Sequence, residues 1–149
     1  MASLSEQLGT GEQRSKLVDD ALHVLDQEVA DKSGLTGMAI KGAYKLVQSV
    51  RPGFLRQVVE HLVDDFLTAL DPIYQEAAAQ KRPAGAYVVE QKSRVADALL
   101  AVTDAKAKRA ESATVRGAYE KLRPIAKKQV EAAAPRLGNL VERHAAPTT

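Results

Sequence analysis

The sequence predicts an all-α protein, folded as one domain of residues 1–149 into a compact bundle of six or seven helices. Apolar residues recur at the three- and four-residue spacing of helix faces, and no segment has the pattern of a strand. Aromatic residues are scarce, with no Trp and two Phe, which favours helices packed through small and aliphatic side chains over aromatic-rich sheets. A chain of 149 residues is long enough to bury a core that supports itself.

Two helices are expected before residue 51. The first carries its apolar face from Leu17 to Val29 and should end at Ser33-Gly34, with the glycine in the left-handed conformation. The second is predicted over about 36–50. Gly37 and Gly42 each cost about 1 kcal/mol of helix propensity, so we expect them to mark close approach of a neighbouring helix.

The strongest helical pattern follows a break at Arg51-Pro52-Gly53. A broad apolar stripe covers residues 54–70. Asp71-Pro72 is typical of a helix cap followed by a first helical residue, so a separate short helix is expected there. The segment 82–85, with its Pro and Gly, is the best candidate for a linker.

Helical periodicity resumes through 88–102 and again over about 113–143. Pro124 and Pro135 should kink or restart the last stretch. The two ends of the chain are expected to be flexible extensions: residues 1–9 and 145–149.

Two parts of the sequence are similar to each other. LVDDALHVLD at 17–26 aligns with VADALLAVTD at 95–104, and AIKGAY at 39–44 aligns with TVRGAY at 114–119. The matches keep their order, which chance similarity between helices would rarely produce. We therefore predict an internal duplication, with two pseudo-symmetric halves packed against each other: residues of about 14–82 and 86–144.

Three stretches, EVADKSGLTGMAIKGAY, RPGF and LDPIY, also resemble a known group of sequences. They are similar to an uncharacterised family of small all-helical proteins from actinobacteria and related bacteria. The resemblance implies a bacterial, cytoplasmic protein, and it implies no activity, ligand or catalytic residue. A cytoplasmic location also fits an N-terminus without an apolar signal region and the absence of long apolar runs.

Charge is distributed unevenly along the chain. Residues 1–74 carry a net charge of −4 and residues 75–149 carry +6, giving the overall +2. One interpretation is attraction between two faces of the same fold. The others are self-association and an anionic partner, such as nucleic acid or an acidic membrane.

The sequence predicts no catalytic, cofactor or metal site. Cysteine is absent, and the three histidines do not form the Glu-x-x-His pairs of a metal site in a helical bundle. No glycine-rich phosphate loop occurs. The repeated Lys/Arg-Gly-Ala-Tyr unit and the basic segment that follows it suggest one candidate binding surface: Lys41, Tyr44, Arg116, Tyr119, Lys121, Arg123, Lys127 and Lys128.

These observations favour a non-enzymatic binding, scaffolding or regulatory protein that contacts an unknown protein partner or a second copy of itself. One alternative is a binder of nucleic acid or acidic membrane through the basic second half. Another is a carrier of a small molecule or lipid, with a cavity between the halves.

Overall fold

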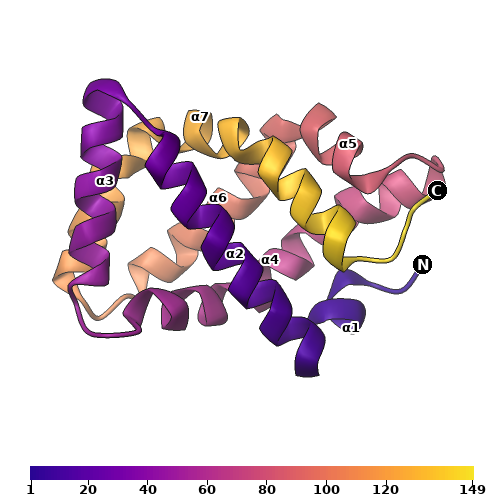
Figure 1. Ribbon diagram of the computed structural model, residues 1–149, viewed down its shortest axis with the longest axis horizontal. Helices are drawn as coiled ribbons and strands as arrows, with labels where there is room; N and C mark the ends of the chain where they lie inside the picture. The colour runs from indigo at the N-terminus through magenta and orange to yellow at the C-terminus, as the bar shows by residue number, and fades with distance from the viewer.

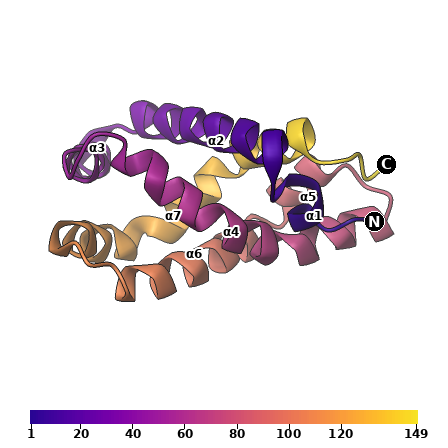
Figure 2. The same cartoon turned by 90° about the horizontal axis from the view of Figure 1, so that it is seen from below.

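The computed structural model describes residues 1–149 and consists of seven helices without strands, as predicted. The helices are α1 (Leu4–Leu8), α2 (Gly11–Asp31), α3 (Gly34–Gln48), α4 (Phe54–Ala79), α5 (Ala84–Glu90), α6 (Lys92–Lys108) and α7 (Ala113–His144). Figure 2 shows α2 on one side and α6 on the other, with α4 and α7 between them. Helix α3 lies at one end of the long axis, and α1, α5 and both termini lie at the other end (Figures 1 and 2).

The tightly packed core lies toward the end of the molecule that holds the termini. Its fourteen buried residues come from α1, α2, α4, α5 and α6, and they include Leu4, Val18, Ala77 and Val95, each at most 1% exposed. Helix α3 contributes none of them. The apolar residues that surround the middle of the bundle are therefore less well covered than those near the termini.

The N-terminal residues belong to the fold, in contrast to the flexible extension expected over 1–9. Residues 4–8 form α1, which is closed by a capping box between Ser3 and Glu6. Leu4 and Leu8 are buried in the core. The backbone N–H of Leu4 donates to the carboxylate of Asp71 at 2.9 Å, which ties α1 to α4.

The C-terminal residues 145–149 are also held against the bundle. The Tyr74 hydroxyl donates to the carbonyl of Ala146 at 2.7 Å, and the Ala146 N–H donates to Gln7 at 2.7 Å. Thr148 is buried and donates to the carbonyl of Arg82. The N-terminal and C-terminal segments are thus both packed against the bundle, at the same end of its long axis.

Asp71-Pro72 does not start a new helix, because α4 continues through it to Ala79. The carboxylate expected to cap that helix bonds to the N-terminus of α1 instead. In α7, both Pro124 and Pro135 lie inside a helix that is unbroken along the chain. The helix changes direction along its length, as Figures 1 and 2 show.

Of the two glycines expected to mark close helix approach, Gly37 does so and Gly42 does not. Gly37 is buried, and a Cβ there would lie 2.7 Å from the backbone of Lys32 at the end of α2. A Cβ at the exposed Gly42 would meet nothing within 4 Å, and the same is true of Gly117. Helices α5 and α7 also approach closely, since a Cβ on Gly138 would lie 2.5 Å from the carbonyl oxygen of Gly85.

Candidate functional site: an apolar cavity between the halves

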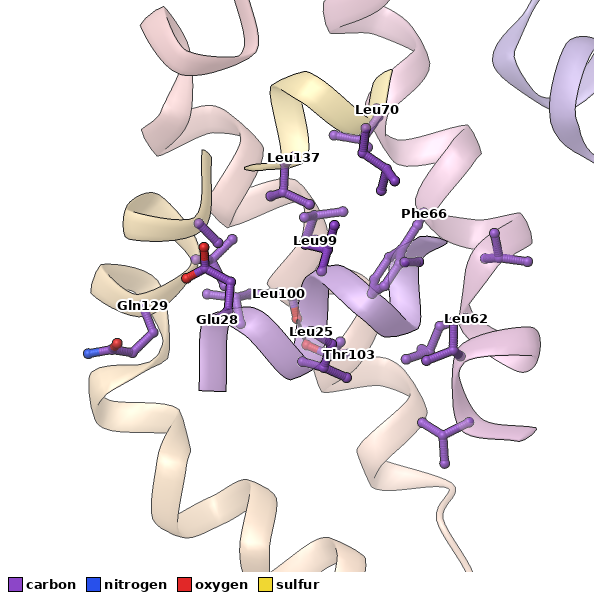
Figure 3. Close-up of a pocket in the computed structure, with 18 of the residues that line it drawn as sticks. Leu25, Glu28, Leu62, Phe66, Leu70, Leu99, Leu100, Thr103, Gln129 and Leu137 are labelled. Atoms are coloured by element: carbon purple, nitrogen blue, oxygen red, sulfur yellow. Dashed lines mark hydrogen bonds between the residues drawn. The ribbon is translucent and has the colours of Figure 1, made fainter. Parts of the chain in front are cut away.

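A cavity of about 470 Å³ occupies the middle of the bundle. Its walls come from α2, α3 and α4 on one side and from α6 and α7 on the other, so it lies between the two ranges 14–82 and 86–144. Of its thirty lining residues, twenty-six are hydrophobic. Figure 3 shows part of the wall, with labelled apolar side chains from α2, α4, α6 and α7: Leu25, Leu62, Phe66, Leu70, Leu99, Leu100 and Leu137.

The strongest apolar stripe in the sequence forms one wall of this cavity. Helix α4 presents it along 55–70, yet Leu62, Phe66 and Leu70 are only partly buried. The facing wall on α7 carries further apolar side chains, among them Leu137 and the smaller Ala126 and Ala133. Apolar side chains therefore bound the cavity on both sides.

The surface area of the molecule agrees with an incompletely filled interior. A folded monomer of 16.0 kDa exposes about 7,400 Å² on average. This chain exposes 8364 Å². The excess fits a bundle whose central side chains remain accessible.

The cavity is open to solvent along part of its boundary, so it is a cleft between the helices and not a sealed void. Its walls expose almost entirely apolar surface, and apolar surface in contact with water is unfavourable. A group that covers these walls would therefore gain the free energy of removing them from water.

The polar residues of the lining are few, and most hold partners of their own. They are Glu28, Lys32, Thr103 and Gln129. The side chain of Glu28 is only 14% exposed, and its carboxylate pairs with Lys32 at 3.2 Å and with Arg136 at 2.9 Å. This small cluster places both signs of charge at one edge of an otherwise apolar space. In Figure 3, Gln129 points away from the leucines.

A second polar network begins at Thr103. Its hydroxyl lies 2.7 Å from the hydroxyl of Tyr119, which donates to Asp104 at 2.5 Å. Arg123 forms an ion pair with the same carboxylate at 2.9 Å. Hydrogen bonds from Arg123 and Tyr119 lower the pKa of Asp104, whereas burial and the bond to Asp104 raise the pKa of Tyr119. The network ties α6 to the first part of α7.

The first half contains a matching bond. The hydroxyl of Tyr44 on α3 donates to Asp26 on α2. Burial, followed by the hydrogen bond to this carboxylate, raises the pKa of Tyr44. Asp26 and Tyr44 are the residues that the sequence alignment pairs with Asp104 and Tyr119. The matching bonds support the predicted duplication, which itself remains a prediction.

Five of the eight residues of the predicted binding surface already have partners within the chain. The hydroxyls of both tyrosines donate to aspartates in the same half of the chain. Three of the cations also have partners in their own half: Arg116 donates to the carbonyl of Ala110, Arg123 pairs with Asp104, and Lys127 pairs with Asp97 at 3.0 Å. The remaining cations are exposed and form no ion pair: Lys41, Lys121 and Lys128.

Ion pairs link the acidic first half to the basic second half. Arg136 contacts Glu28 and Asp31. The other links are Lys106 with Asp65, and Arg143 and His144 with Asp20. Of the interpretations offered for the charge distribution, attraction within one fold is therefore the one this geometry favours.

The acidic residues next to histidines in the sequence have other partners in the fold. Asp64 pairs with Arg14 at 2.5 Å, and Asp65 pairs with Lys106 at 3.0 Å, so both turn away from a joint site with His61. No group of three or more His, Asp or Glu side chains has the arrangement needed to hold a metal ion.

The cavity was anticipated only as the carrier alternative, without residues. The periodicity of 54–70 indicates which face of α4 turns inward, but it does not say whether the opposite wall reaches it. The α7 residues that face this stripe, such as Leu137 and Ala133, are of types that also fill ordinary cores, so the sequence carries no sign of the cavity.

The fold and its interior define an all-α bundle with a large apolar cavity. The chain belongs to the family of unknown function DUF6918, whose model matches residues 4–145, which confirms the resemblance to an uncharacterised family. No curated protein and no solved structure matches the chain. None of the helices combines the length and the apolar character that crossing a membrane requires.

Proposed function

We propose that this protein is a non-enzymatic carrier that binds an elongated apolar ligand, such as the acyl chain of a lipid, in its central cavity. One observation carries the proposal: a space of about 470 Å³ between the halves, with twenty-six hydrophobic residues among the thirty that line it. Sites for small ligands measure about 300–1,000 Å³ and combine mostly apolar walls with a few polar groups. The proposal places the protein in the bacterial cytoplasm, in keeping with the sequence-based expectation.

The distribution of polar groups supports a ligand that is apolar along most of its length. Leu62, Phe66 and Leu99 offer no hydrogen-bond partner, whereas Glu28 and Lys32 are among the four polar residues of the lining. A ligand with a long hydrocarbon part and a small polar end matches this arrangement. Its hydrocarbon part would replace the dispersion contacts that the empty space lacks.

Binding of an anionic partner through the basic second half is supported less well. Arg123, Lys127 and Arg136 already contact carboxylates of the same chain. An external phosphate would have to compete with these internal partners. A carrier that binds its ligand in the apolar cavity does not have to break these internal ion pairs.

A direct test is to titrate the purified protein with a fluorescent polyene fatty acid, then displace it with saturated fatty acids of increasing chain length. We expect saturable binding of one probe per chain and displacement that strengthens with chain length until the cavity is full. Organic extraction of protein from its native host, followed by mass spectrometry, should recover a co-purified lipid. Absence of binding in the titration would contradict the proposal.

A matched pair of variants shows whether the probe occupies this cavity. Ala133 lines it, whereas its neighbour Ala132 is exposed on the same helix. Ala133→Phe should weaken probe binding at least tenfold because the ring takes up ligand space, and Ala132→Phe should leave binding unchanged. Equal binding by both variants would place the probe elsewhere.

A further inference from the structure

Helix α3 exposes apolar side chains to solvent on the side that faces away from the bundle. Leu35, Met38 and Leu46 are 86%, 71% and 53% exposed, and Gly42 between them is exposed as well. Their spacing of three, four and four residues places all four on one side of the helix, which we call the outer face of α3. The opposite side carries the buried Ala43, together with Ile40, which lines the cavity. Helix α3 therefore has two apolar faces, and only one is covered.

The charged residues that α3 itself carries are both positive. Lys41 and Lys45 are the only charged residues of α3, and neither forms an ion pair. At about 100° per residue, both lysines lie along the same edge of the outer face, next to Met38. Arg51 follows in the turn after the helix, stacks on Phe54 and likewise lacks an acidic partner.

We propose that the outer face of α3 docks on the surface of an anionic phospholipid membrane. Apolar side chains on one face with lysines beside them are the pattern of helices that lie in the membrane interface. The lysines are complementary in charge to acidic lipid headgroups. Because α3 lies at one end of the molecule, a flat surface can reach this face (Figures 1 and 2).

A second copy of the chain fits the outer face less well. The same face of another copy carries no acid to pair with Lys41 or Lys45. A helix of fifteen residues is about 22 Å long and about 10 Å wide, so its face offers about 220 Å². A stable protein interface needs about 800 Å² from each partner. The small area and the unmatched charge both favour a membrane over a dimer.

This docking does not depend on a ligand in the cavity, although the two features lie on opposite sides of one helix. Ile40 faces the cavity while Leu35 and Met38 face outward. A protein attached through α3 would therefore hold one end of its cavity close to the lipid surface.

The absence of Trp from the natural chain allows a test with a single fluorescent reporter. Leu35→Trp should show a blue shift in emission when vesicles of phosphatidylglycerol and phosphatidylcholine are added at low salt. Val89→Trp is the matched control, because Val89 is 40% exposed on α5 at the other end of the molecule. A shift for Val89→Trp that equals or exceeds the shift for Leu35→Trp would overturn the proposal.

Vesicle co-sedimentation then identifies the residues responsible. The triple variant Leu35→Ser/Met38→Ser/Leu46→Ser should bind at least tenfold more weakly than wild type, and Lys41→Glu/Lys45→Glu should do the same. Lys127→Glu/Lys128→Glu, on α7, should bind as wild type does. Circular dichroism establishes that each variant is folded, since the α3 changes lie on an exposed face.

Three outcomes would refute docking through α3. Wild-type protein that does not bind anionic vesicles at low salt excludes it. Binding that depends on Lys127 and Lys128 but survives the triple change assigns the membrane contact to α7. A dimer in sedimentation velocity that the triple change dissociates shows that a second copy covers the face.

Discussion

Tyr119 on α7 donates a hydrogen bond to Asp104 on α6, and the oxygen atoms lie 2.5 Å apart. Tyr44 on α3 donates in the same way to Asp26 on α2. Each tyrosine follows a Gly-Ala pair, and each aspartate follows an aligned apolar segment. Two bonds of the same kind at aligned positions are what a duplicated unit would retain, because both fasten a helix to the one before it.

If the two tyrosine–aspartate hydrogen bonds have the same role, removing either one should lower stability by a similar amount. Tyr44→Phe and Tyr119→Phe should each lower the free energy of unfolding by about 1 kcal/mol, since each deletes the hydrogen bond to a carboxylate. Tyr119→Phe also removes the contact with Thr103, so its loss should be the larger of the two. Urea unfolding at pH 7 measures both. A large loss for one variant with none for the other would show that the two settings are unrelated.

The alkaline behaviour of these variants gives an independent check. The pKa of both tyrosines is raised in the folded protein, so each folded phenol keeps its proton at a pH where the unfolded one loses it. Their contribution to stability is therefore complete below about pH 10 and is lost as the pH rises further. The double Phe variant should lose less stability than wild type between about pH 9 and 11, measured by urea unfolding.

Replacing glycines by alanine should distinguish the tight contact between Gly85 and Gly138 from the open positions Gly42 and Gly117. Gly85→Ala should destabilise the fold by about 1–3 kcal/mol, because its Cβ would lie 2.9 Å from the carbonyl oxygen of Gly138. Gly42→Ala and Gly117→Ala meet open space in regular helix and should stabilise it by up to about 1 kcal/mol each. Thermal unfolding of the three variants tests the difference. A higher melting temperature for Gly85→Ala would contradict the close crossing of α5 and α7.

Acid stability should depend on Glu76. Hydrogen bonds from Arg94 and Tyr87 lower the pKa of this carboxyl from 4.5 to about 2. A depressed folded pKa gives stability that is present above about pH 4.5 and is lost as the pH falls toward 2. Glu76→Gln should therefore be less stable than wild type at pH 7 and differ less from it at pH 3, measured by urea unfolding. Glu111→Gln is the matched control, because Glu111 forms no hydrogen bond or ion pair through its side chain.

Periodicity predicted the fold class and the extents of α2, α3 and α7 to within a few residues. It missed α1, the start of α5 at Ala84 inside the expected linker 82–85, and the break between α5 and α6 at Gln91, where no Gly or Pro marks the boundary. Gly34 is left-handed at the turn between α2 and α3, as expected. Asp71-Pro72 was interpreted wrongly because a cap sequence describes a local preference. In the fold, Asp71 bonds to a helix sixty-seven residues away in sequence, and no local pattern contains that information.

The candidate site was harder to predict for a related reason. Sequence patterns show which side of a helix is apolar, but burial depends on how far apart the helices lie. Leu62 and Leu35 are both leucines in amphipathic helices, yet one lines a cavity and the other is exposed to solvent. Sequence patterns also do not show that internal carboxylates such as Asp97 and Asp104 already bind cations of the predicted basic surface.

The cavity predicts a conflict between stability and ligand binding. Ala133→Phe should stabilise the ligand-free protein by about 1–2 kcal/mol, because the ring fills part of the space and regains contacts that the walls lack. Ala132→Phe, on the exposed side, should instead cost about 0.5 kcal/mol of helix propensity. A ligand at a hundred times its Kd stabilises the form that binds it by about 2.7 kcal/mol. Added fatty acid should therefore raise the melting temperature of wild type and of Ala132→Phe, and leave that of Ala133→Phe nearly unchanged. Differential scanning calorimetry of wild type and both variants, with and without ligand, measures these stability changes and ligand responses. A destabilised Ala133→Phe that still responds fully to ligand would mean that the ligand binds outside this cavity.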